Sequence, residues 1–196
     1  MRKIIVVSGL GDNGRELKLA STWWKKEGLE PIIFLPHWEN EKGVKPKLTR
    51  LLRKINIESR DKKILLLGIS AGASLAMNAF LMKPEKIEKV VSLCGRLKMG
   101  LSKDMIRRKL QENTLKRRAF RESVELLQKN LNKLAKIDKK RILTLSAEFG
   151  DEVIPLETST LPGVKNIMIP AIEHVISIFS AMTVNFEPIK KFLLKK

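Results

Sequence analysis

The segment Gly68-Ile69-Ser70-Ala71-Gly72 carries the side chain of this chain that is best suited to covalent chemistry. It follows an apolar run at 64–67, which predicts a buried strand, and it precedes a plausible helix that begins at Ala73. Two glycines allow a strand to turn sharply into a helix, because bulky side chains there would clash with the neighbouring backbone. Such a turn leaves its serine on a strained corner, the arrangement called a nucleophile elbow. The pattern therefore predicts that Ser70 is a covalent nucleophile.

A serine hydroxyl is a weak nucleophile at neutral pH, so it needs a nearby base and a carboxylate that orients the base. The chain has only two histidines, and His174 lies five residues beyond the last predicted strand. Asp151 lies five residues beyond the fifth predicted strand. All three residues thus follow the C-terminal ends of strands, the edge where sites form in an open parallel sheet. The sequence predicts a catalytic triad of Ser70, Asp151 and His174.

Two members of this set also have simpler interpretations. His174 taken alone could be a buried structural histidine, because histidine is often intermediate in burial. Asp151 could be a turn residue after Gly150, since Gly-Asp pairs are common in turns. Glu148 and Glu152 compete for the role of the orienting carboxylate. The joint order and spacing of the three residues favour the catalytic interpretation.

Six short apolar segments predict the strands that position these residues. They lack polar alternation, which is typical of parallel strands covered by helices on both faces. The predicted strands are Lys3–Ser8, Pro31–Leu35, Lys63–Gly68, Lys89–Cys94, Arg141–Ser146 and Lys165–Ile169. The predicted helices are Arg15–Glu27, Val44–Ile57, Ala73–Met82 and Val175–Leu194. This alternation predicts an α/β protein with a doubly wound, mostly parallel sheet, in a single domain over residues 1–196.

One long segment, at 97–140, interrupts the alternation between the fourth and fifth predicted strands. A plain crossover needs about a dozen residues, and this one is several times longer. Two amphipathic helices are expected in it, the first from Met105, Ile106 and Leu110 and the second from Val124 onward. We predict that residues 97–140 form a small helical cap. The alternative is an elaborated crossover with no role as a lid.

With these residues in place, the chain resembles the α/β-hydrolase superfamily over nearly its whole length. Within that superfamily it is similar to compact single-domain serine hydrolases of the retinoblastoma-binding-protein type. The resemblance implies that Ser70 is the nucleophile, His174 the general base and then acid, and Asp151 the orienting carboxylate. It also implies a six-stranded sheet in the order 2-1-3-4-5-6 that lacks the first two strands of the family.

The family pattern further implies an oxyanion hole of two backbone amides, which would stabilise the negative charge of the transition state. The amide of Ala71 supplies one under that pattern. The other is expected from the loop after the first strand, with Leu10 the first choice and Gly11 the second. Gly9 and Gly11 of this loop are also predicted to contact substrate.

The same loop fits the pattern G-x-G-x-x-G at Gly9, Gly11 and Gly14, which also occurs in dinucleotide-binding sites. That fingerprint requires an acidic residue at the end of the second strand. Here Glu39 comes only after the second predicted strand has ended. We therefore expect no nucleotide, no other cofactor and, with one cysteine and two distant histidines, no metal site.

His37 and Trp38 follow the second predicted strand and thus reach the same edge of the sheet. We predict that they line the substrate pocket. The alternative is that they pack the loop, because aromatic residues mostly serve burial.

The chain of 196 residues has a net charge of +18, and between Arg96 and Arg141 it holds 16 Lys or Arg but only 5 Asp or Glu. This predicted cap could attract polyanions such as nucleic acid or anionic membrane weakly, although lysine-rich surfaces are commonly just solvated. The single cysteine, Cys94, excludes an intrachain disulfide. No uncharged apolar stretch reaches the length of a membrane span, so a cytoplasmic location is expected.

Together these features predict a serine hydrolase that cleaves carboxylic ester, thioester or small amide bonds through an acyl-enzyme on Ser70. Its expected partner is a small-molecule acyl substrate. The alternative is a partner-binding protein on the same fold with little or no catalysis, because a fold does not determine function.

Overall fold

The computed structural model describes residues 1–40, 43–134, 139–171 and 173–195. Its centre is one sheet of six strands in the order β2-β1-β3-β4-β5-β6. The strands are β1 (Arg2–Val7), β2 (Leu29–Phe34), β3 (Ile64–Ile69), β4 (Ile87–Leu93), β5 (Ile142–Ala147) and β6 (Lys165–Ile169). Every neighbouring pair is parallel. The predicted fold class and strand order are confirmed.

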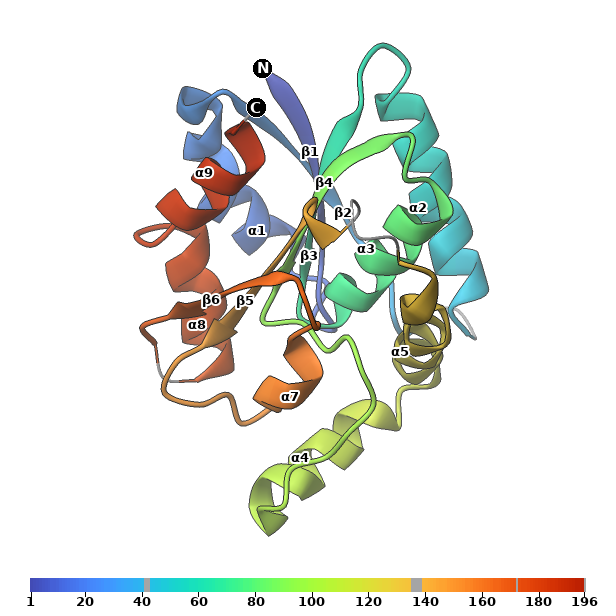
Figure 1. Cartoon of the computed structure of the whole chain (residues 1–196), viewed down its shortest axis with the longest axis vertical. Coiled ribbons are helices and arrows are strands. Elements are labelled where there is room, and N and C mark those ends of the chain that lie inside the picture. Colours follow the sequence, from blue (N-terminus) through green and yellow to red (C-terminus); the bar gives the residue numbers. More distant parts are fainter. Residues whose placement is uncertain (41–42, 135–138, 172, 196) are drawn as a thin grey trace.

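Helices cover both faces of the sheet, as Figure 1 shows. One face carries α1 (Gly14–Ser21), the 3-10 helix η1 (Thr22–Glu27), α8 (His174–Met182) and α9 (Glu187–Leu194). The other carries α2 (Lys45–Glu58), α3 (Ala71–Met82) and α5 (Arg118–Asn130). Because both faces are covered, every residue of β3 and β5 is buried. This burial explains why the strand sequences are apolar without alternation.

The prediction of one helix over Val175–Leu194 is wrong, because the structure has two helices, α8 and α9, in this region. Pro188 is the second residue of α9 and has no amide hydrogen with which to continue the ladder of a preceding helix. The turn between the two helices places Phe186 in the core, where its ring stacks on Trp24 with centroids 4.4 Å apart. The proline therefore indicates in the sequence that a helix ends before it.

The described part of the predicted cap region holds two helices of different character, α4 (Met105–Leu115) and α5, together with the short 3-10 helix η2 (Leu131–Lys133). Helix α5 packs on α3 within the core, and the Ser123 and Ser74 hydroxyls lie 2.8 Å apart. Helix α4 instead projects beyond the rest of the molecule at the C-terminal edge of the sheet (Figure 1). Residues 135–138 of the predicted cap lie outside the described residues. Whether 97–140 acts as a cap stays a prediction.

One short helix, α7 (Leu156–Ser159), was not predicted. It follows the loop that carries Asp151, and its one turn is too short to show a helical period in the sequence. Within the described ranges, no helix is both long and apolar enough to cross a bilayer.

Candidate active site

Ser70 lies on a strained corner between β3 and α3. Its backbone has φ 52° and ψ −119°, a conformation that residues other than glycine rarely adopt. A Cβ atom on Gly68 would lie 2.5 Å from the Cα of Ala73, and one on Gly72 would lie 2.3 Å from the carbonyl oxygen of Val7. Both contacts are with backbone, which cannot move aside. The two glycines are therefore needed for the close approach that holds this corner.

The structure brings together three side chains that are far apart in the sequence. The Nε2 atom of His174 lies 2.9 Å from the Oγ atom of Ser70, 104 residues away along the chain. The Nδ1 atom of His174 lies 2.7 Å from Oδ2 of Asp151. A carboxylate accepts hydrogen bonds, so it favours the tautomer in which Nδ1 carries the proton. The lone pair of Nε2 then faces the Ser70 hydroxyl, as general-base catalysis requires.

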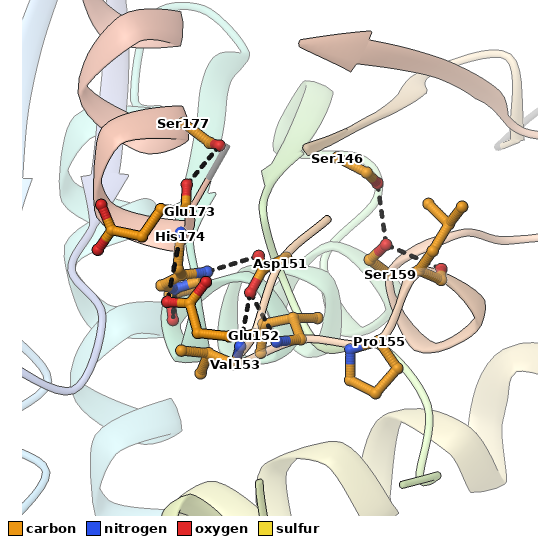
Figure 2. Close-up of polar contacts among 12 residues, drawn as sticks. Ser146, Asp151, Glu152, Val153, Pro155, Ser159, Glu173, His174 and Ser177 are labelled. Carbon is orange, nitrogen blue, oxygen red and sulfur yellow. Dashed lines mark hydrogen bonds and ion pairs between the residues drawn. The ribbon is translucent and has the colours of Figure 1, made fainter. Parts of the chain in front are cut away.

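The Asp151 carboxylate is held on its other side by backbone. Its Oδ1 atom accepts hydrogen bonds from the amides of Val153 at 2.8 Å and Ile154 at 2.7 Å. Figure 2 shows the carboxylate between the His174 ring and these amides. Both the aspartate and the histidine side chains are only 8% exposed. This burial keeps water from competing for the hydrogen bond between them.

The competing carboxylates lie elsewhere. Glu152 reaches the backbone amide of His174 at 3.5 Å rather than the ring. Glu148 is exposed, and its side chain forms no hydrogen bond with another described residue. Of the three candidates, only Asp151 forms a hydrogen bond with the imidazole ring.

His174 is positioned by the start of α8. The residue before it, Glu173, has φ 88°, and its amide donates to the carbonyl oxygen of Gly150 at 3.3 Å. The Ser177 hydroxyl donates to the Glu173 carbonyl oxygen at 2.6 Å (Figure 2). These contacts tie the histidine loop to the aspartate loop, so the two side chains are held as a unit.

A buried arginine lies near Asp151 and was not singled out from the sequence. Arg96 is 0% exposed, and none of its three guanidinium nitrogens has a hydrogen-bond partner within the described part of the chain. Burial lowers the pKa of Arg96 to about 10, although the negative charge of Asp151 opposes this change. Burial also raises the pKa of the nearby Cys94 thiol, with a smaller contribution from Asp151. The cysteine is therefore protonated and unreactive at neutral pH.

The loop after β1 passes beside Ser70. A Cβ atom on Gly9 would lie 3.2 Å from the Cβ of Ser70. Among the described residues, the amide of the next residue, Leu10, has no hydrogen-bond acceptor. Ala71 is the first residue of α3, and the first amides of a helix have no acceptor within it. Neither amide proposed for the oxyanion hole, Leu10 in the loop beside Ser70 or Ala71 directly after it, thus donates to a backbone acceptor in the described part of the chain.

The sequence matches no protein-family model and no curated protein. Solved structures do match it. They include a soluble variant of monoglyceride lipase from Saccharomyces cerevisiae (TM-score 0.70, 9% identity, covering 99% of this chain and 86% of that one). Est1E from Butyrivibrio proteoclasticus has TM-score 0.66 and 15% identity, covering 98% and 86%. An α/β-hydrolase enzyme from the metagenome of sediments from the lagoon of Mar Chica, Morocco, has TM-score 0.65 and 16% identity, covering 98% and 90%.

The chain has the α/β-hydrolase fold. At these identities the likeness concerns the fold, and the site has to be argued from its own residues. In this α/β-hydrolase fold, Ser70 follows β3, at the point where the strand order reverses, and Asp151 and His174 follow β5 and β6.

His37 and Trp38, which follow β2 and are predicted to line the substrate pocket, differ in their surroundings. Trp38 is buried, its ring meets Phe120 edge-on at 6.1 Å, and its Nε1 donates to the Ser8 carbonyl oxygen at 3.4 Å. These contacts favour the packing alternative for Trp38. His37 is exposed, as is Gly11. The Asp12 carboxylate accepts from the amides of both His37 and Trp38, which ties this loop to the loop that carries Leu10.

A cavity of about 720 Å³ lies next to Asp151, which forms part of its wall. Its other walls come from the loop at 98–103, from α4, and from the stretch that runs from the end of β5 through α7. They include Met99, Leu101, Arg107, Ile154 and Leu156. A volume of this size accommodates a small organic ligand. The sequence carried no signal for this cavity, because its walls come from two stretches that are far apart in the chain, 94–111 and 146–159. No cluster of three or more potential metal ligands occurs in the ranges that the structure describes.

Proposed function

We propose that this protein is a serine hydrolase that cleaves carboxylic esters through an acyl-enzyme on Ser70. The observation that carries the proposal is the continuous chain of hydrogen bonds from Asp151 through His174 to Ser70. The fold is consistent with it, because the chain is similar in structure to a soluble variant of a monoglyceride lipase.

In the proposed reaction, Oγ of Ser70 attacks the ester carbonyl carbon while Nε2 of His174 takes the hydroxyl proton. The carbonyl oxygen becomes an oxyanion, which the amides of Ala71 and Leu10 stabilise. The buried Asp151 carboxylate stabilises the imidazolium that forms at the same time. When the intermediate collapses, His174 returns the proton to the leaving alkoxide, which departs as an alcohol.

The second half of the reaction reverses these roles with water. His174 takes a proton from a water molecule, whose oxygen attacks the acyl carbon. The second intermediate then releases a carboxylic acid and restores the Ser70 hydroxyl. Each oxyanion donor of this kind is worth about 3 kcal/mol in the transition state. Thioesters and small amides can react by the same steps and belong to the proposed substrate range.

We further propose that α4 and the loop at 98–104 form the cap of this site, while α5 belongs to the core. Several residues of this part, among them Met99, Leu101 and Arg107, line the cavity beside Asp151. Helix α5 instead packs on α3 and buries Phe120 and Val124 in the hydrophobic core. The cap would then determine which acyl or alcohol groups fit.

A fluorophosphonate probe tests the proposal directly, because it phosphonylates only an activated serine. We expect labelling of the wild type at Ser70, located by peptide mass spectrometry, and turnover of p-nitrophenyl acetate. Ser70→Ala should abolish both while the thermal unfolding transition is kept. Ser180→Ala, a partly exposed serine on α8, is the matched control and should behave as wild type. Unlabelled wild type with an intact fold would rule out the activated serine and leave the partner-binding alternative.

A further inference from the structure

Helix α4 is oriented with its apolar side chains toward solvent. Met105 is 83% exposed and Ile106 is 84% exposed, and Leu110 is also exposed. The residues that α4 buries are Gln111, at 0% exposure, and Leu115. A surface helix usually buries its apolar stripe and exposes its polar face. Here most of the apolar stripe has no protein partner among the described residues.

This orientation is held by specific contacts. The side-chain Oε1 of Gln111 accepts from the Ser102 amide at 2.8 Å, and its Nε2 donates to the Glu152 carbonyl oxygen at 3.3 Å. The Asp104 carboxylate caps the helix by accepting from the Arg107 amide at 2.9 Å. Rotating α4 to bury Ile106 would turn Gln111 away from its site and break both of its hydrogen bonds. The outward apolar face is therefore the arrangement that the polar contacts favour.

Cations lie beside this apolar face, although Arg108, Arg117 and Arg118 are paired with glutamates. Residues 98–118 include eight Lys or Arg and only two Asp or Glu. At about 3.6 residues per turn, Lys109 and Lys116 fall on the same side of α4 as Met105 and Ile106. Neither lysine forms an ion pair with any described residue, and both are exposed. A face that combines apolar and cationic side chains suits an anionic, partly apolar surface.

Helix α4 also lies at the C-terminal edge of the sheet, where the strands that precede the candidate triad end (Figure 1). Other large apolar side chains are exposed in segments that follow strand ends at this edge. They are Leu101, Phe149, Leu156, Val175 and Ile176. A surface that meets α4 would therefore lie beside the cavity next to Asp151.

We propose that α4, with the loop at 98–104, is a docking surface for anionic lipid bilayers. The apolar side chains would enter the boundary between headgroups and acyl chains, and the lysines would lie against the anionic headgroups. Nucleic acid could use the cations, but it would leave Met105 and Ile106 in contact with charged backbone and water. A second copy of the chain would bring like charges together. An anionic bilayer is the partner that can contact both the apolar side chains and the lysines. Docking to it does not depend on whether Ser70 is catalytic.

Co-sedimentation with vesicles tests this surface, with the Ser70→Ala protein so that no lipid is consumed. The vesicles contain phosphatidylcholine alone or phosphatidylcholine with phosphatidylglycerol. We expect binding to the anionic vesicles that weakens as ionic strength rises, and little binding to the neutral ones. Each Lys near an anionic leaflet strengthens binding about fivefold. The double substitution Lys109→Gln with Lys116→Gln should then weaken binding about 25-fold, and Ile106→Gln should weaken it about tenfold.

Matched controls come from other exposed positions. Lys62→Gln with Lys63→Gln removes two exposed lysines at the opposite edge of the sheet, and Val184→Gln changes an 85% exposed side chain between α8 and α9. Both should bind as the parent does. Equal binding to neutral and anionic vesicles, absence of binding at low ionic strength, or equal losses in the controls would each overturn the docking surface. So would an RNA oligonucleotide that binds more tightly than the vesicles and is insensitive to Ile106→Gln.

The same variants in the Ser70-containing protein separate this inference from the proposed function. They should keep the wild-type unfolding temperature, the fluorophosphonate label and the turnover of p-nitrophenyl acetate. None of the exchanged side chains lines the cavity, and the two α4 residues that do, Arg107 and Gln111, are unchanged. Loss of vesicle binding with labelling intact supports the surface. Absence of labelling in every protein, with vesicle binding intact, would refute the hydrolase proposal alone.

Discussion

Replacement of the buried Arg96 by methionine is predicted to stabilise the folded protein. The guanidinium is 0% exposed and has no hydrogen-bond partner within the described part of the chain. A charged group in that position loses its hydration and regains only the attraction of Asp151. Methionine has a similar length without the charge, so it fills much of the same space.

The size of the effect follows from the pKa of Arg96, which burial lowers from its usual 12.5 to about 10. A lowering of this size corresponds to a cost of about 3 kcal/mol for burying the charged form. The guanidinium of Arg96 binds its proton more tightly in the unfolded chain than in the folded protein. Burial of the charged form therefore lowers the free energy of unfolding at neutral pH, and this effect declines only above pH 10. We expect Arg96→Met to raise the free energy of unfolding by about 1 to 3 kcal/mol at pH 7.

Urea unfolding followed by tryptophan fluorescence measures this change, because Trp24 is buried and stacked on Phe186. Arg53→Met, at an exposed position of α2, is the control and should change stability by less than about 0.5 kcal/mol. Arg96→Lys keeps the buried charge and should not stabilise the protein. If Arg96→Met lowers the free energy of unfolding by about 1 kcal/mol or more, then Arg96 has a favourable partner and the reasoning is refuted.

Three further predictions concern the site and the scaffold. Asp151→Asn should lower kcat for p-nitrophenyl acetate by about four orders of magnitude with the fold intact, because an amide cannot stabilise the imidazolium of His174; a loss below tenfold would contradict this role. Gly72→Ala should destabilise the fold by about 2 kcal/mol or more in urea unfolding, because its Cβ would meet the Val7 carbonyl oxygen at 2.3 Å; unchanged stability would contradict the close approach. Hydrogen bonds from two lysines lower the pKa of Glu58, so its contribution is present above pH 4.5 and is lost as the pH falls through the lowered value. Glu58→Gln should therefore lower the unfolding temperature at pH 7 but much less at pH 3, and an equal decrease at both pH values would exclude an ionic contribution.

Much of the fold could be predicted from local sequence. Each strand is a short run of Ile, Val and Leu, and such a run is stable only where helices cover both faces of a parallel sheet. The corner at Ser70 could also be predicted from the sequence, because only glycine tolerates the backbone contacts that surround Gly68 and Gly72. Pro188 also indicates the break between α8 and α9. The prediction of a single helix is wrong there because the helical spacing of apolar residues continues across the break.

The sequence by itself thus determined the strands, the serine corner and the order of the candidate triad, because these depend on neighbouring residues and on the chain direction in a parallel sheet. Only the tertiary structure decided that His174 contacts Asp151 rather than another carboxylate, since that contact depends on where two separate loops meet. The burial of Arg96 and the outward face of α4 were also decided there. A helical pattern shows which side chains share a face, but whether that face meets protein or solvent depends on segments distant in the chain.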